Sequence, residues 1–128
     1  MPDSSRKRVV VTGIGVVSPL GQGIEPFWQN LLAGQCGLDS ITAFDTEGFP
    51  CTIAGEVKEF EPAEAFPSPK EVRRTDRFTQ FGVHAGWQAL NDSGLDLDQA
   101  NRDRVGAMIG SGIGGLATLE SQQKTLLD

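Results

Sequence analysis

The sequence predicts an α/β fold, and three patterns carry that prediction. Residues 9–11 form an uninterrupted valine run, which suits a strand buried on both faces, as in a parallel sheet covered by helices. Residues 105–109 have a similar strand-like pattern near the other end of the chain. Between them, apolar side chains recur at helical spacing over about 25–33 and about 76–92. Strands with intervening helices indicate an α/β arrangement.

The composition is that of an ordinary soluble domain, and it excludes several classes of protein. The chain has 128 residues, 38% hydrophobic and 22% charged, which is enough for one domain with its own core. A net charge of −6 argues against nucleic-acid binding. No apolar run is long enough to span a membrane, and the polar start lacks a secretory signal. Two cysteines make no disulfide framework, so we expect a reduced, cytoplasmic setting.

A glycine-rich turn follows the first predicted strand. Gly13 and Gly15 permit a sharp change of direction at low steric cost. A dinucleotide-binding turn would need a third glycine at position 18 and a helix opening there, but the chain has Ser18 and Pro19. The short-chain dehydrogenase variant would need glycine in place of Val17. Both nucleotide motifs therefore fail at this turn.

Helix ends are marked along the chain. Pro26 and Gly34 bracket the first helix, because proline suits a first turn and glycine a left-handed C-cap. Ser68, followed three residues later by Glu71, has the spacing of a capping box and predicts a helix start. Gly94 ends the main helix. We also expect a short strand over 52–57, one helical turn over 61–66 and a last helix from about 116.

Several residues that can carry chemistry are interpreted as structural. Cys36 and Cys51 have no cation or helix start beside them in the sequence to activate a thiol. His84, the single histidine, lies in the middle of the main helix. In the same helix, Gly82 and Gly86 predict close packing against another element, because glycine costs a helix about 1 kcal/mol relative to alanine.

Two stretches together resemble a known family. The opening VVVTGIGVVSPLG and the later VGAMIGSGIGGL both resemble segments of the β-ketoacyl-acyl carrier protein synthases, and the second is closest to the synthase II type. LLAGQCGL, AGEVKEF and NDSGL lie between them, where that family has similar segments. The resemblance extends from Arg6 to Asp128. We therefore expect residues 1–128 to be an N-terminal synthase domain, with 1–5 as a loose tail.

The resemblance implies a fold and a reaction. The fold would be thiolase-like, with this chain supplying most of the first βαβαβ half. The reaction would be a decarboxylative Claisen condensation in a homodimer, with substrates carried on the phosphopantetheine of acyl carrier protein and with no other cofactor and no metal. The family's catalytic cysteine, two histidines and lysine would lie beyond Asp128. We therefore expect no catalytic residue in this chain, which looks truncated and should be inactive alone.

The resemblance also implies two groups of site residues. Gly112, Ile113 and Leu116 would line an acyl tunnel, although ordinary core packing also explains them. Lys70, Arg73 and Arg74 would dock the carrier protein. With Arg77, they place four cations on one predicted helix face in an acidic chain. The alternative for these cations is a solvated face with Glu71 and Asp76 as partners.

Two other functions remain open at this point. A non-catalytic homologue, such as a chain-length-factor subunit, would share the same N-terminal pattern without the cysteine. A nucleotide-binding module is the second, because Gly110, Gly112 and Gly115 do match GxGxxG after a predicted strand and before a predicted helix. That motif alone is weak evidence.

Overall fold

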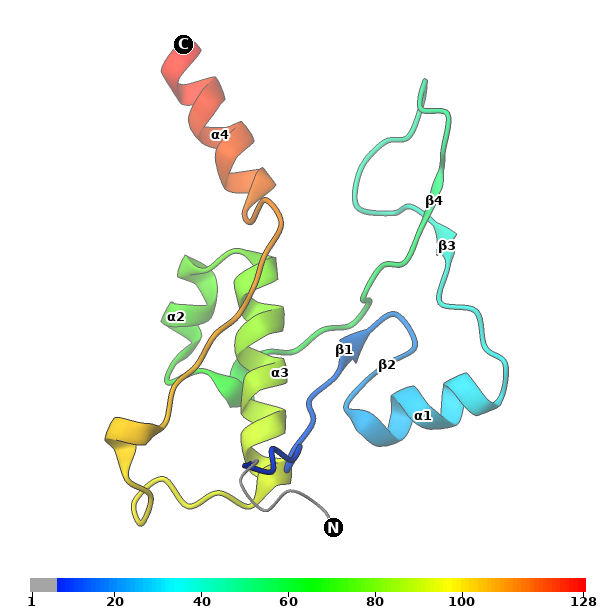
Figure 1. Cartoon of the computed structure of the whole chain (residues 1–128). Helices are drawn as coiled ribbons and strands as arrows, with labels where there is room; N and C mark the ends of the chain where they lie inside the picture. The colour runs from blue at the N-terminus through cyan, green and yellow to red at the C-terminus, as the bar shows by residue number, and fades with distance from the viewer. Residues whose placement is uncertain (1–6) are drawn as a thin grey trace.

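The computed structural model describes residues 7–128, so the tail expected at 1–5 lies outside the described residues. Four α-helices, two 3₁₀ turns and four very short strands make up its regular structure (Figure 1). In chain order the elements are β1 (Val17–Ser18), β2 (Gly21–Gln22), α1 (Ile24–Leu32), β3 (Asp39–Ser40), β4 (Ile53–Ala54), η1 (Ala63–Ala65), α2 (Pro69–Arg74), α3 (Arg77–Ser93), η2 (Arg102–Arg104) and α4 (Leu116–Leu127).

Helix α3 occupies the centre of the arrangement in Figure 1. The N-terminal segment runs along α3 to β1, and the segment that follows η2 passes the same helix on its way to α4. Helix α2 lies beside the N-terminal end of α3, and α4 rises from that end. Helix α1 and the β3–β4 pair lie on the opposite side of α3 from α2.

The strands form two small antiparallel pairs. Val17 lies opposite Gln22 in the β1–β2 pair, and Asp39 lies opposite Ala54 in the β3–β4 pair. Strand β4 falls within the strand predicted over 52–57. The β1–β2 and β3–β4 pairings were not expected from the sequence.

The predicted strands at 9–11 and 105–109 are wrong for the described chain. Neither segment pairs with another strand among residues 7–128, and the expected parallel βαβαβ half is absent from that part. Val9 is 94% exposed and Met108 is 99% exposed. A strand exists only through hydrogen bonds to a neighbour, whereas a β-branched run specifies only that an extended conformation suits it.

The helices agree with the sequence, including their C-terminal caps. After α1, Gly34 adopts φ 68°. Its amide donates to the carbonyl of Leu31 at 3.1 Å, and the Gln35 amide donates to that of Asn30 at 3.0 Å. These two bonds form a Schellman motif. Gly94 closes α3 with φ 65°. Glycine is needed at both positions because the left-handed conformation is costly for other residues.

Helix α2 begins where the sequence predicts but without the expected capping box. Ser68 is the N-cap and has an extended conformation, yet its side chain makes no capping hydrogen bond. The Ser68 carbonyl instead accepts from the Glu71 amide at 3.1 Å. The Glu71 carboxylate points to Arg74, at 4.0 Å. Glu71 therefore pairs with Arg74 on the same helix and does not form the expected capping-box hydrogen bond with Ser68.

An elbow separates α2 from α3. Thr75 and Asp76 are both extended between the two helices. The Gln80 side-chain amide donates to the carbonyl of Val72 at 2.9 Å and to that of Thr75 at 3.0 Å. These bonds satisfy carbonyls that a helix C-terminus leaves free. A side chain of α3 thus fixes the end of α2.

The glycine-rich turn lies directly on α3. A Cβ added at Gly15 would overlap the carbonyl oxygen of Ala85. One added at Gly13 would overlap the carbonyl oxygen of Ala89 and lie 2.6 Å from the amide nitrogen of Ser93. The glycines therefore permit backbone-to-backbone contact, which differs from the phosphate-binding use weighed above.

Polar side chains of α3 complete this contact. Gln88 accepts a hydrogen bond from the Val16 amide at 2.8 Å, and Asp92 accepts one from the Ile14 amide at 2.9 Å. The two acceptors are four residues apart, so they lie on one face of the helix. On another part of α3, Gly82 faces Ile109, with 3.3 Å between an added Cβ and the Ile109 Cγ2 atom. Gly86 meets nothing within 4 Å, so the predicted close packing holds only at Gly82.

The buried core of the described residues is small. Phe60, Pro62 and His84 are its buried members, and the Phe60 ring lies 4.8 Å from the Phe81 ring and 5.3 Å from that of His84. His84 is thus a core residue, and its Nδ1 atom has no hydrogen-bond partner within residues 7–128. No helix of the described part is long and apolar enough to cross a membrane.

Much apolar surface is left uncovered. The accessible surface is 10657 Å², whereas a compact monomer of this mass would expose about 6,600 Å². The exposed apolar side chains include the valines at 9–11 and several leucines of α4. Patches of this extent are typical of surfaces that another protein layer covers.

We expect Gly15→Ala to destabilise the fold, because its methyl group would collide with the α3 backbone. Overpacking of this kind typically costs about 1–3 kcal/mol. The matched control is Gly86→Ala on α3, where the space is open and alanine should stabilise the helix by up to about 1 kcal/mol. Urea unfolding followed by circular dichroism measures both. Equal midpoints for the two variants would contradict the proposed contact.

Candidate functional site

The residues predicted to bind substrate and partner gather around one end of α3. The basic group lies on α2, which joins α3 through the elbow. The predicted tunnel segment leads into α4, which rises from the same end (Figure 1). The elbow after α2 and the first turn of α4 are in contact through Asp76 and Thr118, which are 42 residues apart in the sequence.

Three of the four predicted cations share one face of α2. Lys70, Arg73 and Arg74 are exposed, and the two arginines follow Lys70 by three and four residues, which places each beside Lys70 on a helix. Arg74 has Glu71 at 4.0 Å. Within residues 7–128, no carboxylate pairs with Lys70 or Arg73. The two are available to a partner.

Arg77 does not belong to this face, which corrects the sequence analysis. The elbow interrupts the helix at residues 75–76, so Arg77 starts α3 instead of continuing α2. Its guanidinium lies 5.0 Å from the centre of the Phe81 ring and 5.7 Å from that of Phe60, and it donates a hydrogen bond to the carbonyl of Val57. These cation–π and backbone contacts give Arg77 a structural role.

The predicted tunnel residues lie at the N-terminal end of α4 and just before it. Ile113 is 80% exposed and Leu116 is 52% exposed. A cavity of about 410 Å³ lies beside this segment, and Ile113 is in its wall whereas Gly112 and Leu116 are not. The full wall consists of Asp76, Phe78, Ile113, Gly114, Gly115, Thr118, Leu119 and Gln122.

Asp76 connects the elbow to the foot of α4. Its Oδ1 atom accepts a hydrogen bond from the Thr118 hydroxyl at 2.6 Å. Its carboxylate also occupies the space that a side chain at Gly115 would need. The ring of Phe78 lies beside Gly114, with 3.4 Å between its Cζ atom and an added Cβ.

This arrangement argues against the nucleotide-binding hypothesis. A dinucleotide motif needs a strand before its glycines and a free helix N-terminus for the phosphates. The element before Gly110 in the described residues is the 3₁₀ turn η2, and no strand lies between η2 and Gly110. The Asp76 carboxylate lies against Gly115, the N-cap of α4. A negative charge at that position would repel a phosphate group.

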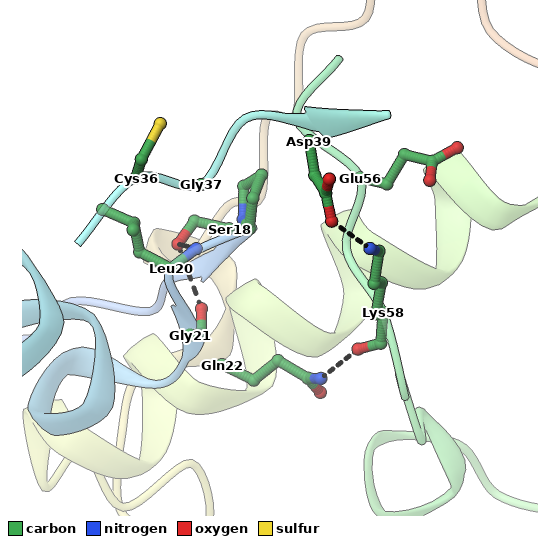
Figure 2. A pocket seen from close by; sticks show the side chains of 10 residues that line it. Ser18, Leu20, Gly21, Gln22, Cys36, Gly37, Asp39, Glu56 and Lys58 are labelled. Atoms are coloured by element: carbon green, nitrogen blue, oxygen red, sulfur yellow. Dashed lines mark hydrogen bonds and ion pairs between the residues drawn. The ribbon is translucent and has the colours of Figure 1, made fainter. Parts of the chain in front are cut away.

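A second, polar pocket of about 230 Å³ lies between the β1–β2 turn and the β3–β4 pair (Figure 2). The Ser18 hydroxyl donates to the carbonyl of Gly21 at 3.1 Å and accepts from the Leu20 amide at 3.2 Å. Figure 2 shows Lys58 and Asp39 on the opposite wall, paired at 2.9 Å. The substrate- and partner-binding residues predicted above lie outside its wall.

Hydrogen bonds beside this pocket shift the pKa values of three side chains. The hydrogen bond from Lys58 holds the pKa of Asp39 below its ordinary value, and the same bond raises the pKa of Lys58. The pKa of Glu56 is lowered, first by the Thr42 hydroxyl at 2.8 Å and then by the Thr42 amide. The Ala43 amide also donates to Glu56, at 2.9 Å. One carboxylate therefore fixes the start of the loop between β3 and β4.

The two cysteines, which the sequence analysis interprets as structural, lie at the surface. Both Cys36 and Cys51 are free and exposed. The Cys36 Sγ atom lies 3.7 Å from the carbonyl oxygen of Leu38, and that of Cys51 lies 3.5 Å from the carbonyl oxygen of Ile53. Cys36 lines the polar pocket. Among residues 7–128, no group of three histidine, cysteine or acidic residues could hold a metal ion.

The chain is a mixed α/β fragment that matches the N-terminal third of ketosynthase structures. A family model described as the N-terminal domain of beta-ketoacyl synthase matches residues 6–127. The chain belongs to the beta-ketoacyl synthase family.

Relatives with assigned names support this membership over the whole chain. A 3-oxoacyl-[acyl-carrier-protein] synthase 2 from Synechocystis sp. is 46% identical over 128 residues, 100% of this chain and 30% of the relative. The same-named protein of Coxiella burnetii is 48% identical over 122 residues, 95% of this chain and 29% of the relative. The chain thus spans about a third of the length of these relatives.

Solved ketosynthase structures are also similar to nearly the whole chain. The chain is similar to the ishigamide ketosynthase/chain length factor, with a TM-score of 0.75 and 35% identity over 97% of this chain and 31% of that one. A second similar structure contains a type II PKS acyl-carrier protein in complex with its ketosynthase. Its TM-score is 0.70, with 30% identity over 95% of this chain and 31% of that one.

Sequence reasoning missed three residues of this site. Asp76 was considered only as a partner for the basic residues, and Thr118 and Phe78 were given no role at the site. The Asp76–Thr118 contact spans 42 residues and Phe78 packs beside Gly114, so no local pattern indicates them. The one available signal was an aspartate directly before a helix, and it predicts a cap that the structure does not form.

We expect the Glu56 carboxyl to titrate below its ordinary pKa of 4.5 in the folded chain. Because folding depresses this pKa, its contribution to stability is complete above the unfolded pKa and is lost as the pH falls through the folded pKa. Carbon-13 NMR titration of the carboxyl, with the chain in urea as the reference, measures both values. The amide shifts of Thr42 and Ala43 should follow the same titration.

The variant Thr42→Val removes the hydroxyl that contributes most to this shift, so it should raise the pKa of Glu56. The matched control is Thr46→Val in the same loop. If Glu56 titrates identically in the folded chain and in urea, the loop contact does not exist in solution.

Proposed function

We propose that this chain works as the N-terminal part of a synthase II condensing enzyme, in which α2 receives acyl carrier protein and Ile113 contacts the acyl chain. The observation that carries the proposal is that the exposed cations of α2 precede the elbow whose Asp76 lines the same cavity as Ile113. Family membership and the names of the relatives, 3-oxoacyl-[acyl-carrier-protein] synthase 2, support the reaction class.

The basic face of α2 suits an acidic carrier protein. Lys70, Arg73 and Arg74 stand out in a chain with a net charge of −6. A single exposed ion pair contributes only about 0.2–1 kcal/mol. A cluster increases the rate of encounter and fixes the orientation of the partner. The similar structure of a ketosynthase with its acyl-carrier protein supports this choice of partner.

The reaction of the whole enzyme would be a decarboxylative Claisen condensation. An enzyme cysteine holds the acyl group as a thioester. Malonyl-acyl carrier protein loses carbon dioxide, and the resulting carbanion equivalent attacks the thioester carbonyl. A carbon–carbon bond forms and the cysteine thiolate leaves. This chain would contribute binding and orientation through α2 and Ile113, and no residue of 7–128 is assigned a catalytic role.

A non-catalytic, chain-length-factor role is the second candidate. It is favoured by the similar structure whose name combines a ketosynthase and a chain length factor. Both candidates use the same N-terminal pattern, and they differ by the presence of the nucleophilic cysteine. Sequencing the gene beyond the codon for Asp128 separates them, because a cysteine motif of the synthase type favours the first candidate and its loss favours the second.

Charge reversal on α2 tests carrier-protein docking. We expect Arg73→Glu combined with Arg74→Glu to weaken binding of acyl carrier protein to the chain by at least about fivefold at low salt, because attraction becomes repulsion. The difference should shrink as salt rises, since exposed charges are screened over about 10 Å at 0.1 M. Fluorescence anisotropy of a labelled carrier protein measures the dissociation constant.

The control for this experiment reverses two other exposed cations, Lys7→Glu with Arg104→Glu, and changes the net charge equally. Turnover of a small thioester that needs no carrier protein, measured in a synthase that carries this chain, should survive the α2 reversal. Docking at α2 is wrong if both reversals weaken binding equally, or if the small thioester is affected as strongly as the carrier-protein substrate.

The proposed contact of Ile113 with the acyl chain predicts a change in chain-length preference. In a synthase that carries this chain, Ile113→Phe should fill the space beside α4 and reduce kcat/KM for long acyl substrates while sparing short ones. The matched control is Ile53→Phe, at an exposed site on β4. An unchanged chain-length profile in a folded Ile113→Phe enzyme would refute the contact.

A further inference from the structure

The N-terminal end of α4 contacts residues of the elbow and of the first turn of α3. Asp76 accepts a hydrogen bond from Thr118 at 2.6 Å, and its carboxylate fills the space beside Gly115. The Phe78 ring packs beside Gly114, which has φ 92° and so suits glycine. These contacts hold both sides of the turn that follows Ile113.

Asp76 bonds to a side chain of α4 and not to its own helix. Asp76 is the N-cap of α3, where an aspartate usually accepts a hydrogen bond from an amide of its own helix. Here the side chain makes no capping bond and accepts from α4 instead. A hydroxyl-to-carboxylate bond of this length is charge-assisted and among the stronger hydrogen bonds in proteins. The preference for α4 over its own helix indicates a positioning role.

The elbow that carries Asp76 is itself rigid. Gln80 fixes the carbonyls of Val72 and Thr75, and the Thr75 hydroxyl donates to the carbonyl of Val72 at 3.0 Å. Arg73 and Arg74 lie immediately before this elbow. A continuous set of contacts therefore runs from the basic face of α2, through Asp76, to the turn after Ile113.

We propose that Asp76 is a positioning residue that holds the turn after Ile113 against the α2–α3 elbow, so that the carrier-docking face and the acyl-binding cavity keep one relative position. The effect on substrate rests on the proposed function, whereas the contact itself does not. Displacing the turn would move Ile113 relative to the docked carrier protein. Asp76 would thereby influence chain-length preference through the position of Ile113.

Hydrogen exchange tests the contact in the chain itself. The Leu116 amide donates to the carbonyl of Gly114 at 3.1 Å, and the Leu119 amide to that of Gly115 at 3.0 Å. Thr118→Val removes the hydroxyl and keeps the shape of the side chain, so both amides should exchange about three- to tenfold faster. Thr118→Ser keeps a hydroxyl and should restore the slower exchange.

The matched control is Thr125→Val on the same helix, because the Thr125 hydroxyl donates only within α4, to the carbonyl of Ser121 at 3.0 Å. Exchange at Leu116 and Leu119 should remain unchanged in that variant. The inference is overturned if Thr118→Val and Thr125→Val give the same exchange rates. Asp76→Asn, which keeps an acceptor oxygen but loses the charge, should give an intermediate rate.

A kinetic measurement tests the positioning role. In a synthase that carries this chain, Thr118→Val should change the ratio of kcat/KM for long and short acyl substrates by at least about threefold, and Thr118→Ser should not. Faster exchange with an unchanged ratio would refute positioning of the acyl cavity. Faster exchange together with failure of the charge-reversal experiment would remove the docking proposal and leave the Asp76 contact in place.

Discussion

The structure depends on the backbone of residues 13–15 lying directly on helix α3. A side chain at Gly13 or Gly15 would overlap carbonyl oxygens of that helix, so only glycine permits the approach. Gln88 and Asp92 then accept the amides of Val16 and Ile14. A segment that would otherwise be an unpaired strand thereby gains a fixed path, and this path leads into the β1–β2 turn and the polar pocket beside it.

Helix α3 also organises the opposite end of the molecule. Through Gln80 it fixes the end of α2, and Asp76 at its N-terminus contacts α4. The basic face and the cavity beside Ile113 are consequently set by one helix, even though their residues are far apart in sequence. The core that supports this helix is small, and the exposed apolar surface is well above that of a compact monomer of this mass. A covering protein layer would account for both features and fits the size of the relatives, of which this chain spans about 30%.

Local signals predicted the helices well, whereas long-range pairing could not be predicted. Gly34 and Gly94 marked helix ends because a left-handed cap is a local requirement. The valine run at 9–11 is typical of a strand, but a strand also needs a neighbour that the described residues do not provide. The charges of Lys70, Arg73 and Arg74 were visible in the sequence, yet the elbow that removes Arg77 from their face was not. Asp76 was missed because its partner lies 42 residues away.

The central claim, that residues 13–16 are docked on α3, is tested most directly by native-state hydrogen exchange of the Ile14 and Val16 amides. These two amides bond only to side chains of α3, so they report the contact and no strand pairing. Our account predicts that they are protected and open together with the α3 amides between residues 85 and 92, with the same dependence on denaturant. Exchange of Ile14 and Val16 at the rate of an unstructured peptide, while α3 stays protected, would contradict it.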